Sequence, residues 1–334
     1  MELFNAIFLL LLVLAFKRGK NNDVLSLETC NVLKGIAIAG VFVGHCSKVF
    51  TGVFLYKWFC SLGLFSVSLF FFISGYGLMC GIIKQKENYR KGFIWKRIYP
   101  LLVTYSLAIL LYYVLGGGKL TYRNVILCGY VPFSWYILSI TVLYSMTYIS
   151  LLISGKGVFV IGIVSLLLCF FIAVVSLMDN LPYTLLGGGQ MITFVIGMAV
   201  SYFDRLKIIK YGWLPLSILF AFFWSVQLTT KYAHWSPLLY DAGQYIMSYT
   251  FPFVLFGALR FLSLRAKWKQ VWLWVQKYTL EIYLVHGCIM FYVVNNNGWN
   301  INSEILIFII FAATLLLALV FKFIQNKAIS LLYR

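Results

Sequence analysis

The stretch KGIAIAGVFVGH, residues 34–45, begins with a lysine and ends with a histidine eleven residues later. Every residue between them is apolar or glycine, as in a segment that crosses a lipid bilayer. An ionisable side chain at membrane depth is costly to keep, and is therefore a candidate functional group. His286 lies in a second apolar segment, and the chain has only 3 histidines. The placement of His45 and His286 predicts proton or acyl-group chemistry inside a membrane.

The composition indicates a polytopic membrane protein. Hydrophobic residues make up 62% of the 334 residues, charged residues only 11%, and the mean hydropathy is +0.91. A soluble domain is nearer a quarter charged. The formal net charge of +18 suggests nucleic acid at first, but basic residues also collect in the cytoplasmic loops of membrane proteins. We therefore expect a lipid bilayer around the chain and no nucleic-acid partner. The 7 cysteines are scattered without a Cys-x-x-Cys pair, so neither a disulfide framework nor a metal site is expected.

Apolar runs of about 17–25 residues can cross the bilayer as helices. The sequence predicts an all-α bundle of about eleven transmembrane helices, the first of them short for a span. The predicted spans are residues 2–16, 31–54, 58–83, 98–115, 133–154, 158–178, 185–203, 211–230, 238–259, 271–294 and 303–323.

The distribution of basic residues predicts the orientation of the chain in the membrane. The first apolar run is followed, not preceded, by basic residues, unlike a secretory signal. We therefore expect it to stay attached, with the N-terminus outside, the C-terminus cytoplasmic and most of the 27 Lys and Arg residues in inner loops. Three regions follow: an additional N-terminal helix and basic loop (1–26), a membrane domain (27–323) and an amphipathic cytoplasmic tail (324–334).

The two membrane histidines are predicted to lie at similar depth. At about 1.5 Å of rise per residue, His45 lies roughly 21 Å above Asn31, where its helix enters from the cytoplasm. His286 lies about 22 Å above Val271 by the same reckoning. The side chains can therefore meet in one cavity if the two helices touch, which the sequence leaves open.

Structural interpretations compete with functional ones at each position. His45 can be a buried histidine bonded to a carbonyl, and Lys34 can be an interfacial lysine that snorkels. Glu281 and Lys277 have the i, i+4 spacing of a helix-stabilising ion pair. The basic cluster from Lys84 to Arg97 can simply follow the positive-inside rule, although cations at the membrane edge also suit a phosphorylated ligand.

Taken in order, six segments resemble acyltransferase family 3, the integral membrane acyltransferases that modify bacterial glycans and other extracytoplasmic acceptors. The segments are Lys34–His45, Ser68–Tyr76, Arg97–Pro100, Phe133–Leu138, Phe194–Met198 and Glu281–His286. The resemblance covers about residues 27–323. This sequence departs from the family pattern by having Lys34 in place of an arginine, and Ile94 where an arginine often stands before the Tyr-Pro.

The resemblance implies a ten-helix core in the bacterial cell membrane and O-acyl transfer. The donor would be cytoplasmic acetyl-CoA or another short acyl-CoA, and the acceptor a hydroxyl of an extracytoplasmic or lipid-linked glycan, such as capsule, exopolysaccharide or O-antigen. No metal is implied. His45 would act as general base or transient acyl carrier. The expected catalytic residues are His45, Glu281 and His286; the expected donor-binding residues are Lys34, Lys96 and Arg97; the expected acceptor-binding residues are Trp135, Tyr136 and Tyr76.

Two other functions compete with acyl transfer. A proton-coupled transporter or flippase for a glycan precursor would use His45, Glu281 and His286 as a proton relay. A non-catalytic membrane partner in a glycan-assembly complex would not need the histidines. The sequence leaves open the acceptor, the length of the acyl group and the oligomeric state.

Overall fold

The computed structural model describes residues 2–19, 23–50, 61–177, 188–203, 205–233, 237–296 and 303–332. These residues are almost entirely helical, with one two-stranded antiparallel sheet. The α-helices are, in chain order, α1 (Glu2–Ala15), α2 (Leu27–Val49), α4 (Leu62–Gln85), α5 (Phe93–Arg97), α6 (Tyr99–Val114), α7 (Tyr122–Ile126), α8 (Trp135–Ile153), α9 (Gly157–Ser176), α10 (Gly188–Tyr202), α11 (Arg205–Ala233), α12 (Pro237–Ala258), α13 (Ala266–Val275), α14 (Thr279–Asn295) and α15 (Ser303–Leu332). Short 3-10 helices precede α5 (η1, Lys86–Arg90) and α14 (η3, Gln276–Tyr278).

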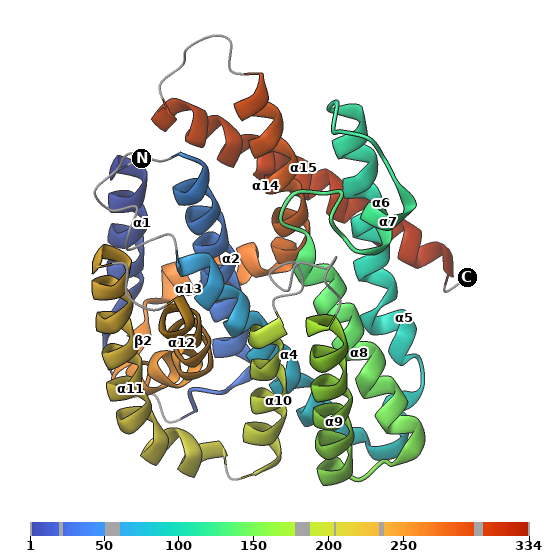
Figure 1. Cartoon of the computed structure of the whole chain (residues 1–334), viewed down its shortest axis with the longest axis vertical. Helices are drawn as coiled ribbons and strands as arrows, with labels where there is room; N and C mark the ends of the chain where they lie inside the picture. Colours follow the sequence, from blue (N-terminus) through green and yellow to red (C-terminus); the bar gives the residue numbers. More distant parts are fainter. Residues whose placement is uncertain are drawn as a thin grey trace.

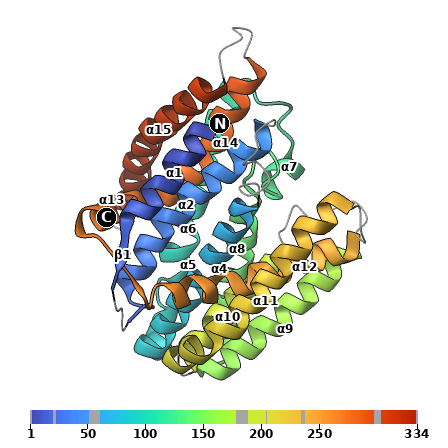
Figure 2. The ribbon, with the colours of Figure 1, turned by 90° about the vertical axis from the view of Figure 1, so that its left-hand side faces the viewer.

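Helices α2, α4 and α14 form the centre of the bundle (Figure 1). Helix α4 packs against α2, α10 and α12, and α14 packs against α2, α6 and α15. Figure 2 shows α1, α2, α14 and α15 on one side and α9 to α12 on the other, with α4 and α8 between them. The site described below lies where α2, α4, α8 and α14 come together.

The apolar helices agree with a membrane bundle. In the part of the chain that the structure describes, six helical segments are long and apolar enough to cross a membrane, and two shorter apolar helices, Tyr99–Val114 and Gly189–Tyr202, accompany them. The six are Leu27–Val49, Leu62–Gln85, Trp135–Ile153, Gly157–Ser176, Ile208–Val226 and Glu304–Leu331. The all-α membrane fold is confirmed, whereas the count of eleven spans stays a prediction.

The predicted span 271–294 is two helices rather than one. Helix α13 ends at Val275, the 3-10 turn η3 follows, and α14 begins only at Thr279. Helix α13 packs against α2, where Gly35 lets the Trp272 carbonyl approach more closely than any side chain would allow. Lys269 of α13 also pairs with Glu28 at the start of α2 (2.6 Å). The depth of His286 therefore cannot be counted from Val271, because the helix that carries His286 starts eight residues later.

The last helix also differs from its predicted bounds. Helix α15 runs without a break to Leu332, past the boundary predicted at residue 323. Gln325 lies beyond that boundary, yet it is 2% exposed and donates from Nε2 to Thr104 Oγ1 of α6 (2.6 Å). The beginning of the predicted tail is therefore part of the packed bundle.

Two loops predicted to be cytoplasmic meet in the sheet. Strand β1 (Phe16–Arg18) pairs with β2 (Leu262–Leu264), and the Arg265 amide donates to the Ala15 carbonyl (2.9 Å). The sheet joins residues far apart in the chain and ties α1 to the end of the bundle where α2 begins. The membrane topology predicted from the basic residues of these loops stays a prediction.

Glycines allow α4 and α10 to pack closely, as small residues do between membrane helices. A Cβ atom at Gly75 would overlap the Phe194 carbonyl, and one at Gly197 would overlap the Phe72 carbonyl. The two positions face each other across the same interface, so neither helix can take a larger side chain there without moving apart. This interface holds α4, which carries part of the functional site.

We predict that Gly75→Ala destabilises the protein by about 1–3 kcal/mol, because the added methyl group overpacks the interface between α4 and α10. The measurement is the thermal unfolding midpoint of purified protein in detergent. Gly77→Ala is the matched control, because a Cβ at Gly77 meets nothing within 4 Å. An equal midpoint for the two variants would contradict the close packing at Gly75.

Candidate functional site

The two membrane histidines are in direct contact. His45 of α2 and His286 of α14 are 6% and 0% exposed, and His45 Nδ1 lies 2.7 Å from His286 Nε2. Their rings are nearly coplanar, with an interplanar angle of 7° and centroids 5.0 Å apart. The pair is therefore joined edge to edge by one hydrogen bond inside an apolar core.

The second nitrogen of His286 is bonded to its own helix. His286 Nδ1 lies 3.0 Å from the Ile282 carbonyl, one turn earlier in α14. A helical carbonyl oxygen has two lone pairs, so it can accept from the backbone amide four residues later and from a side chain as well. The contact fixes the orientation of the His286 ring, which in turn orients His45.

Phe133 covers one face of His45. The two rings are stacked with centroids 3.9 Å apart and an interplanar angle of 15°. Phe133 has a φ of 63°, a left-handed conformation that is unusual for a bulky residue and is often found at functional sites. Two contacts hold the backbone there: the Tyr283 hydroxyl donates to the Phe133 carbonyl, and Gly287 leaves room for the carbonyl of Pro132. Helix α14 thus positions both His286 and the ring that covers His45.

The turn before Phe133 is buried and carries a thiol. The Ser134 hydroxyl lies 2.5 Å from the Cys128 carbonyl and 2.7 Å from the Val131 carbonyl, which closes the turn. Burial raises the pKa of the Cys128 thiol to about 11. Because the thiolate is the reactive form, Cys128 is not a nucleophile at neutral pH and does not compete with the histidines for an acyl group.

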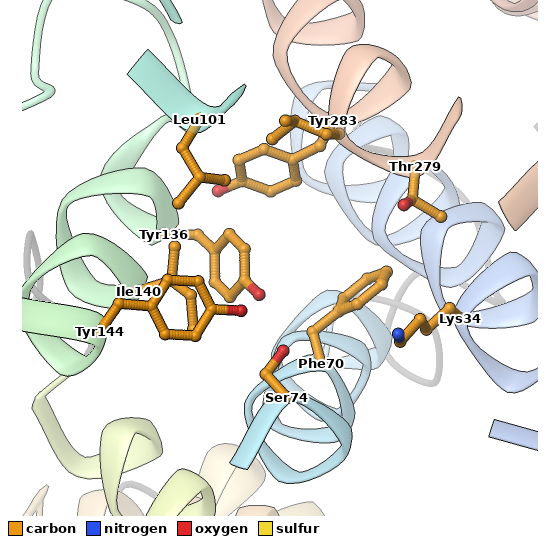
Figure 3. Close-up of a pocket in the computed structure, with 10 residues that line it drawn as sticks. Lys34, Phe70, Ser74, Leu101, Tyr136, Ile140, Tyr144, Thr279 and Tyr283 are labelled. Atoms are coloured by element: carbon orange, nitrogen blue, oxygen red, sulfur yellow. The ribbon is translucent and has the colours of Figure 1, made fainter. Parts of the chain in front are cut away.

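A cavity of about 160 Å³ lies between α2, α4, α6, α8 and α14 (Figure 3). Its polar lining residues are Lys34, Ser74, Tyr136, Tyr144, Thr279 and Tyr283, and its apolar lining residues are Phe70, Leu101, Ile140 and Leu280. Figure 3 shows the hydroxyls of Ser74, Tyr136 and Tyr144 directed toward one another, with the Lys34 ammonium on the far side of Phe70. The cavity therefore offers one cation and several hydroxyls among apolar walls.

Tyr283 lies close to both this cavity and the histidine pair. Its ring centroid lies 5.4 Å from that of Tyr136 in the cavity wall and 6.0 Å from that of His286. Lys34 precedes His45 by three helical turns on α2, or roughly 16 Å of rise. Along the axis of α2, the cavity thus extends from Lys34 toward the two histidines.

The basic residues predicted to bind a donor take different positions. Lys34 lines the cavity. The Arg97 guanidinium donates to the Tyr89 hydroxyl (2.9 Å) and also interacts with Tyr144, which is a cavity residue. Lys96 is exposed, and its side chain lies near Gly92. Lys34 thus lines the cavity and Arg97 contacts the lining residue Tyr144, whereas Lys96 is exposed and is not among the lining residues.

Glu281 is not joined to the histidines. It is fully buried, and its Oε1 accepts from Lys322 of α15 (3.2 Å). Lys322 also donates to Gln325 (2.8 Å), which is bonded to Thr104 of α6. Five residues of helix separate Glu281 from His286, which turns the two side chains toward different neighbours. The expected catalytic carboxylate instead links α14 to α15, and its ion-pair partner is Lys322, not the Lys277 suggested by the i, i+4 spacing.

The aromatic residues predicted to contact an acceptor are also separated. Tyr136 lines the cavity on the Lys34 side of the histidine pair. Trp135 packs near Phe71, with ring centroids 6.4 Å apart, and Tyr76 is buried in the core of α4 at 4% exposure. Neither Trp135 nor Tyr76 lines the cavity.

Sequence reasoning missed several residues that shape the site. Tyr283 precedes His286 by three residues, the spacing that places two side chains on one helix face, so its role was readable from the sequence. Tyr144 and Ser74 had weaker signals, because hydroxyls are common in membrane helices. Nothing in the sequence indicates the left-handed conformation of Phe133. Among the described residues, no group of three His, Cys, Asp or Glu side chains is placed to hold a metal ion.

Comparison with known proteins agrees with this arrangement. Residues 28–323 match a family model described as an acyltransferase domain, and the chain therefore belongs to acyltransferase family 3. The match includes α2 through most of α15, and with them both histidines and the whole cavity. No match was found among curated proteins or among solved structures. The protein is thus a membrane acyltransferase by family.

We predict that Lys322→Met destabilises the protein by about 3 kcal/mol, because it leaves the buried Glu281 carboxylate without its cation. Chemical or thermal unfolding of purified protein measures the change. Lys327→Met is the matched control, since Lys327 is an exposed lysine of the same helix. The double variant Lys322→Met, Glu281→Gln should recover much of the lost stability. A Lys322→Met variant as stable as the Lys327→Met control would contradict the structural role of this ion pair.

Proposed function

We propose that this protein is a membrane O-acyltransferase that moves an acetyl or other short acyl group from cytoplasmic acyl-CoA to a hydroxyl of an extracytoplasmic glycan. The observation that carries the proposal is the contact between His45 and His286 beside a cavity that also contains Lys34. Family membership supports acyl transfer as the reaction, and the apolar helices support a membrane as its location.

The cavity fits the acyl end of a CoA thioester. Its volume of about 160 Å³ is close to that of a cavity of about 150 Å³ that accommodates benzene. A group of that size is comparable to an acetyl or short acyl group and much smaller than a fatty acyl chain. Apolar walls suit the acyl carbons, and the hydroxyls of Tyr136 and Tyr144 suit the thioester carbonyl. Tyr136 is therefore proposed as a donor contact rather than the acceptor contact expected from the sequence.

Lys34 and Arg97 would hold the anionic part of the donor. Coenzyme A carries phosphates, which bind strongly to guanidinium and ammonium groups. Arg97 precedes α6 at one end of the cavity, where a cytoplasmic ligand would enter. Lys34 keeps the charge of the arginine usual at that position, although it lacks the planar fork.

His45 would act on the acceptor. A sugar hydroxyl is a weak nucleophile at neutral pH, and an imidazole can take its proton as the oxygen attacks the thioester carbonyl. The transport alternative is less well supported, because Glu281 is engaged with Lys322 and does not continue a proton relay from His286.

We predict that His45→Ala abolishes acyl transfer, with a loss of at least about 100-fold, while the protein still inserts and accumulates normally. The assay is incubation of purified protein with labelled acetyl-CoA and candidate glycans, followed by mass spectrometry of the glycans. Gly77→Ala is the control for handling and folding. Near-normal acylation by the His45→Ala variant would refute the assignment.

Arg97→Ala is expected to raise KM for acetyl-CoA by about 10-fold or more with little change in kcat, because it removes a charge-assisted contact with the donor. Lys96→Ala is the matched control, since it removes the neighbouring cation, which does not line the cavity. Steady-state kinetics at varied acetyl-CoA measures both parameters. A pure kcat effect in Arg97→Ala, or an equal KM change in Lys96→Ala, would exclude this role for Arg97.

A further inference from the structure

The hydrogen bonds of the histidine pair determine where its protons lie. The Ile282 carbonyl can only accept, so the His286 Nδ1 at 3.0 Å from it must carry a proton. A neutral imidazole has one protonated nitrogen. If His286 is neutral, its Nε2 is therefore a bare acceptor.

Burial keeps both rings neutral. His45 is 6% exposed and His286 is 0% exposed, and an uncompensated charge in such a place is strongly unfavourable. The nearest carboxylate along α14, Glu281, is already paired with Lys322. His286 Nε2 therefore accepts, and the His45 Nδ1 at 2.7 Å donates to it. Within the part of the chain that the structure describes, His45 Nε2 is then the one unprotonated nitrogen of the pair without a hydrogen bond.

Two neighbours among the described residues, Phe133 and Gly63, bear on how a ligand can approach that nitrogen. Phe133 covers a face of the His45 ring at 3.9 Å, so a ligand cannot stack on that side. Gly63 of α4 is a second neighbour of the ring, and a Cβ atom there would lie 3.9 Å from both His45 Nε2 and His45 Cδ2. Because Gly63 has no side chain, it leaves open the space that a methyl group would take next to Nε2.

We infer that His286 is a positioning residue that holds His45 in the tautomer with a bare Nε2, and that Gly63 keeps the space before this nitrogen open for the acceptor hydroxyl. The inference rests on the proposed acyl transfer for its chemistry, but the proton positions stand independently of it. Its structural basis is the chain of contacts from the Ile282 carbonyl through both rings to Nε2.

In the proposed transfer step, His45 Nε2 takes the proton of the acceptor hydroxyl as the oxygen forms a bond to the thioester carbonyl carbon. The C–S bond breaks, and the sulfur leaves with its electron pair and receives the proton from His45. The positive charge held briefly on His45 is stabilised through its Nδ1–H bond to His286 Nε2. The pair returns to its starting protonation after each transfer.

Nitrogen NMR of the full-length protein in lipid nanodiscs, with isotope-labelled histidine, tests the tautomer directly. The chain has only 3 histidines, so His45→Ala and His286→Gln variants assign the signals. We expect His45 with a protonated Nδ1 and an unprotonated Nε2, and His286 with a protonated Nδ1. A protonated Nε2 on His45 would overturn the inference. This result does not depend on acyl transfer, so it separates a failure of the inference from a failure of the proposed function.

Kinetics tests the positioning role. His286→Leu removes the acceptor for His45 Nδ1 and should lower kcat by about 100-fold with little change in the KM for acetyl-CoA. His286→Gln keeps an acceptor oxygen near the same place and should recover at least about 10-fold of that loss. Equal kcat values for the Leu and Gln variants would contradict positioning through this hydrogen bond. If the His286→Leu variant does not fold, the kcat of His286→Gln relative to the wild type and the NMR result still test the positioning role of His286.

Gly63→Ala tests the open space. The added methyl group lies at ordinary contact distance from His45, so the fold should be kept, and alanine favours the helix. It nevertheless occupies the region that the acceptor hydroxyl needs, and we expect the KM for the acceptor to rise by about 10-fold or more. Gly77→Ala on the same helix is the control. An unchanged acceptor KM in Gly63→Ala would exclude this approach to Nε2.

Discussion

The hydrogen bond between His45 and His286 is the interaction on which the site depends. It joins α2 to α14 at a point where both side chains are buried, and it can be made only if the two helices pack at one register. A buried polar group is costly unless it is hydrogen-bonded, and each histidine supplies the other with that hydrogen bond. The same register brings Tyr283 beside Tyr136, and it places Phe133 against one face of the His45 ring.

In the proposed function, this arrangement would keep the donor and the acceptor on different sides of the histidine pair. The cation Lys34, the hydroxyl residues and Arg97 gather on one side of the histidine pair, at the end of the bundle where α2 begins and α6 enters. Gly63 and the turn before Phe133 lie on the other side. A donor and an acceptor that arrive from opposite faces of a membrane would meet at His45 in such a site. The ion pair of Glu281 with Lys322 contributes differently, because it fixes α15 against the helix that carries His286.

Much of the fold could be predicted from the sequence, because long apolar runs between basic loops leave little alternative to membrane helices. The depth argument correctly placed His45 and His286 level with each other, although the helix of His286 begins at Thr279 and not at Val271. The contact itself joins residues 241 positions apart and depends on packing that a single sequence does not reveal. Local spacing was misleading for Glu281, because its partner Lys322 lies 41 residues away on another helix, and Lys277 belongs to a 3-10 turn. The left-handed backbone at Phe133 likewise depends on Tyr283 and Gly287, which are distant in sequence.

In the proposed mechanism, an acyl group moves from a cytoplasmic donor to an acceptor from the other face of the membrane, with His45 as the base. Sealed proteoliposomes of one known orientation, with labelled acetyl-CoA on the cytoplasmic face of the protein and a glycan acceptor on the opposite face, test this mechanism most directly. We expect labelled acceptor when donor and acceptor are on these two faces, and none when the donor is supplied only on the acceptor side. Transfer that requires donor and acceptor on the same face would contradict it.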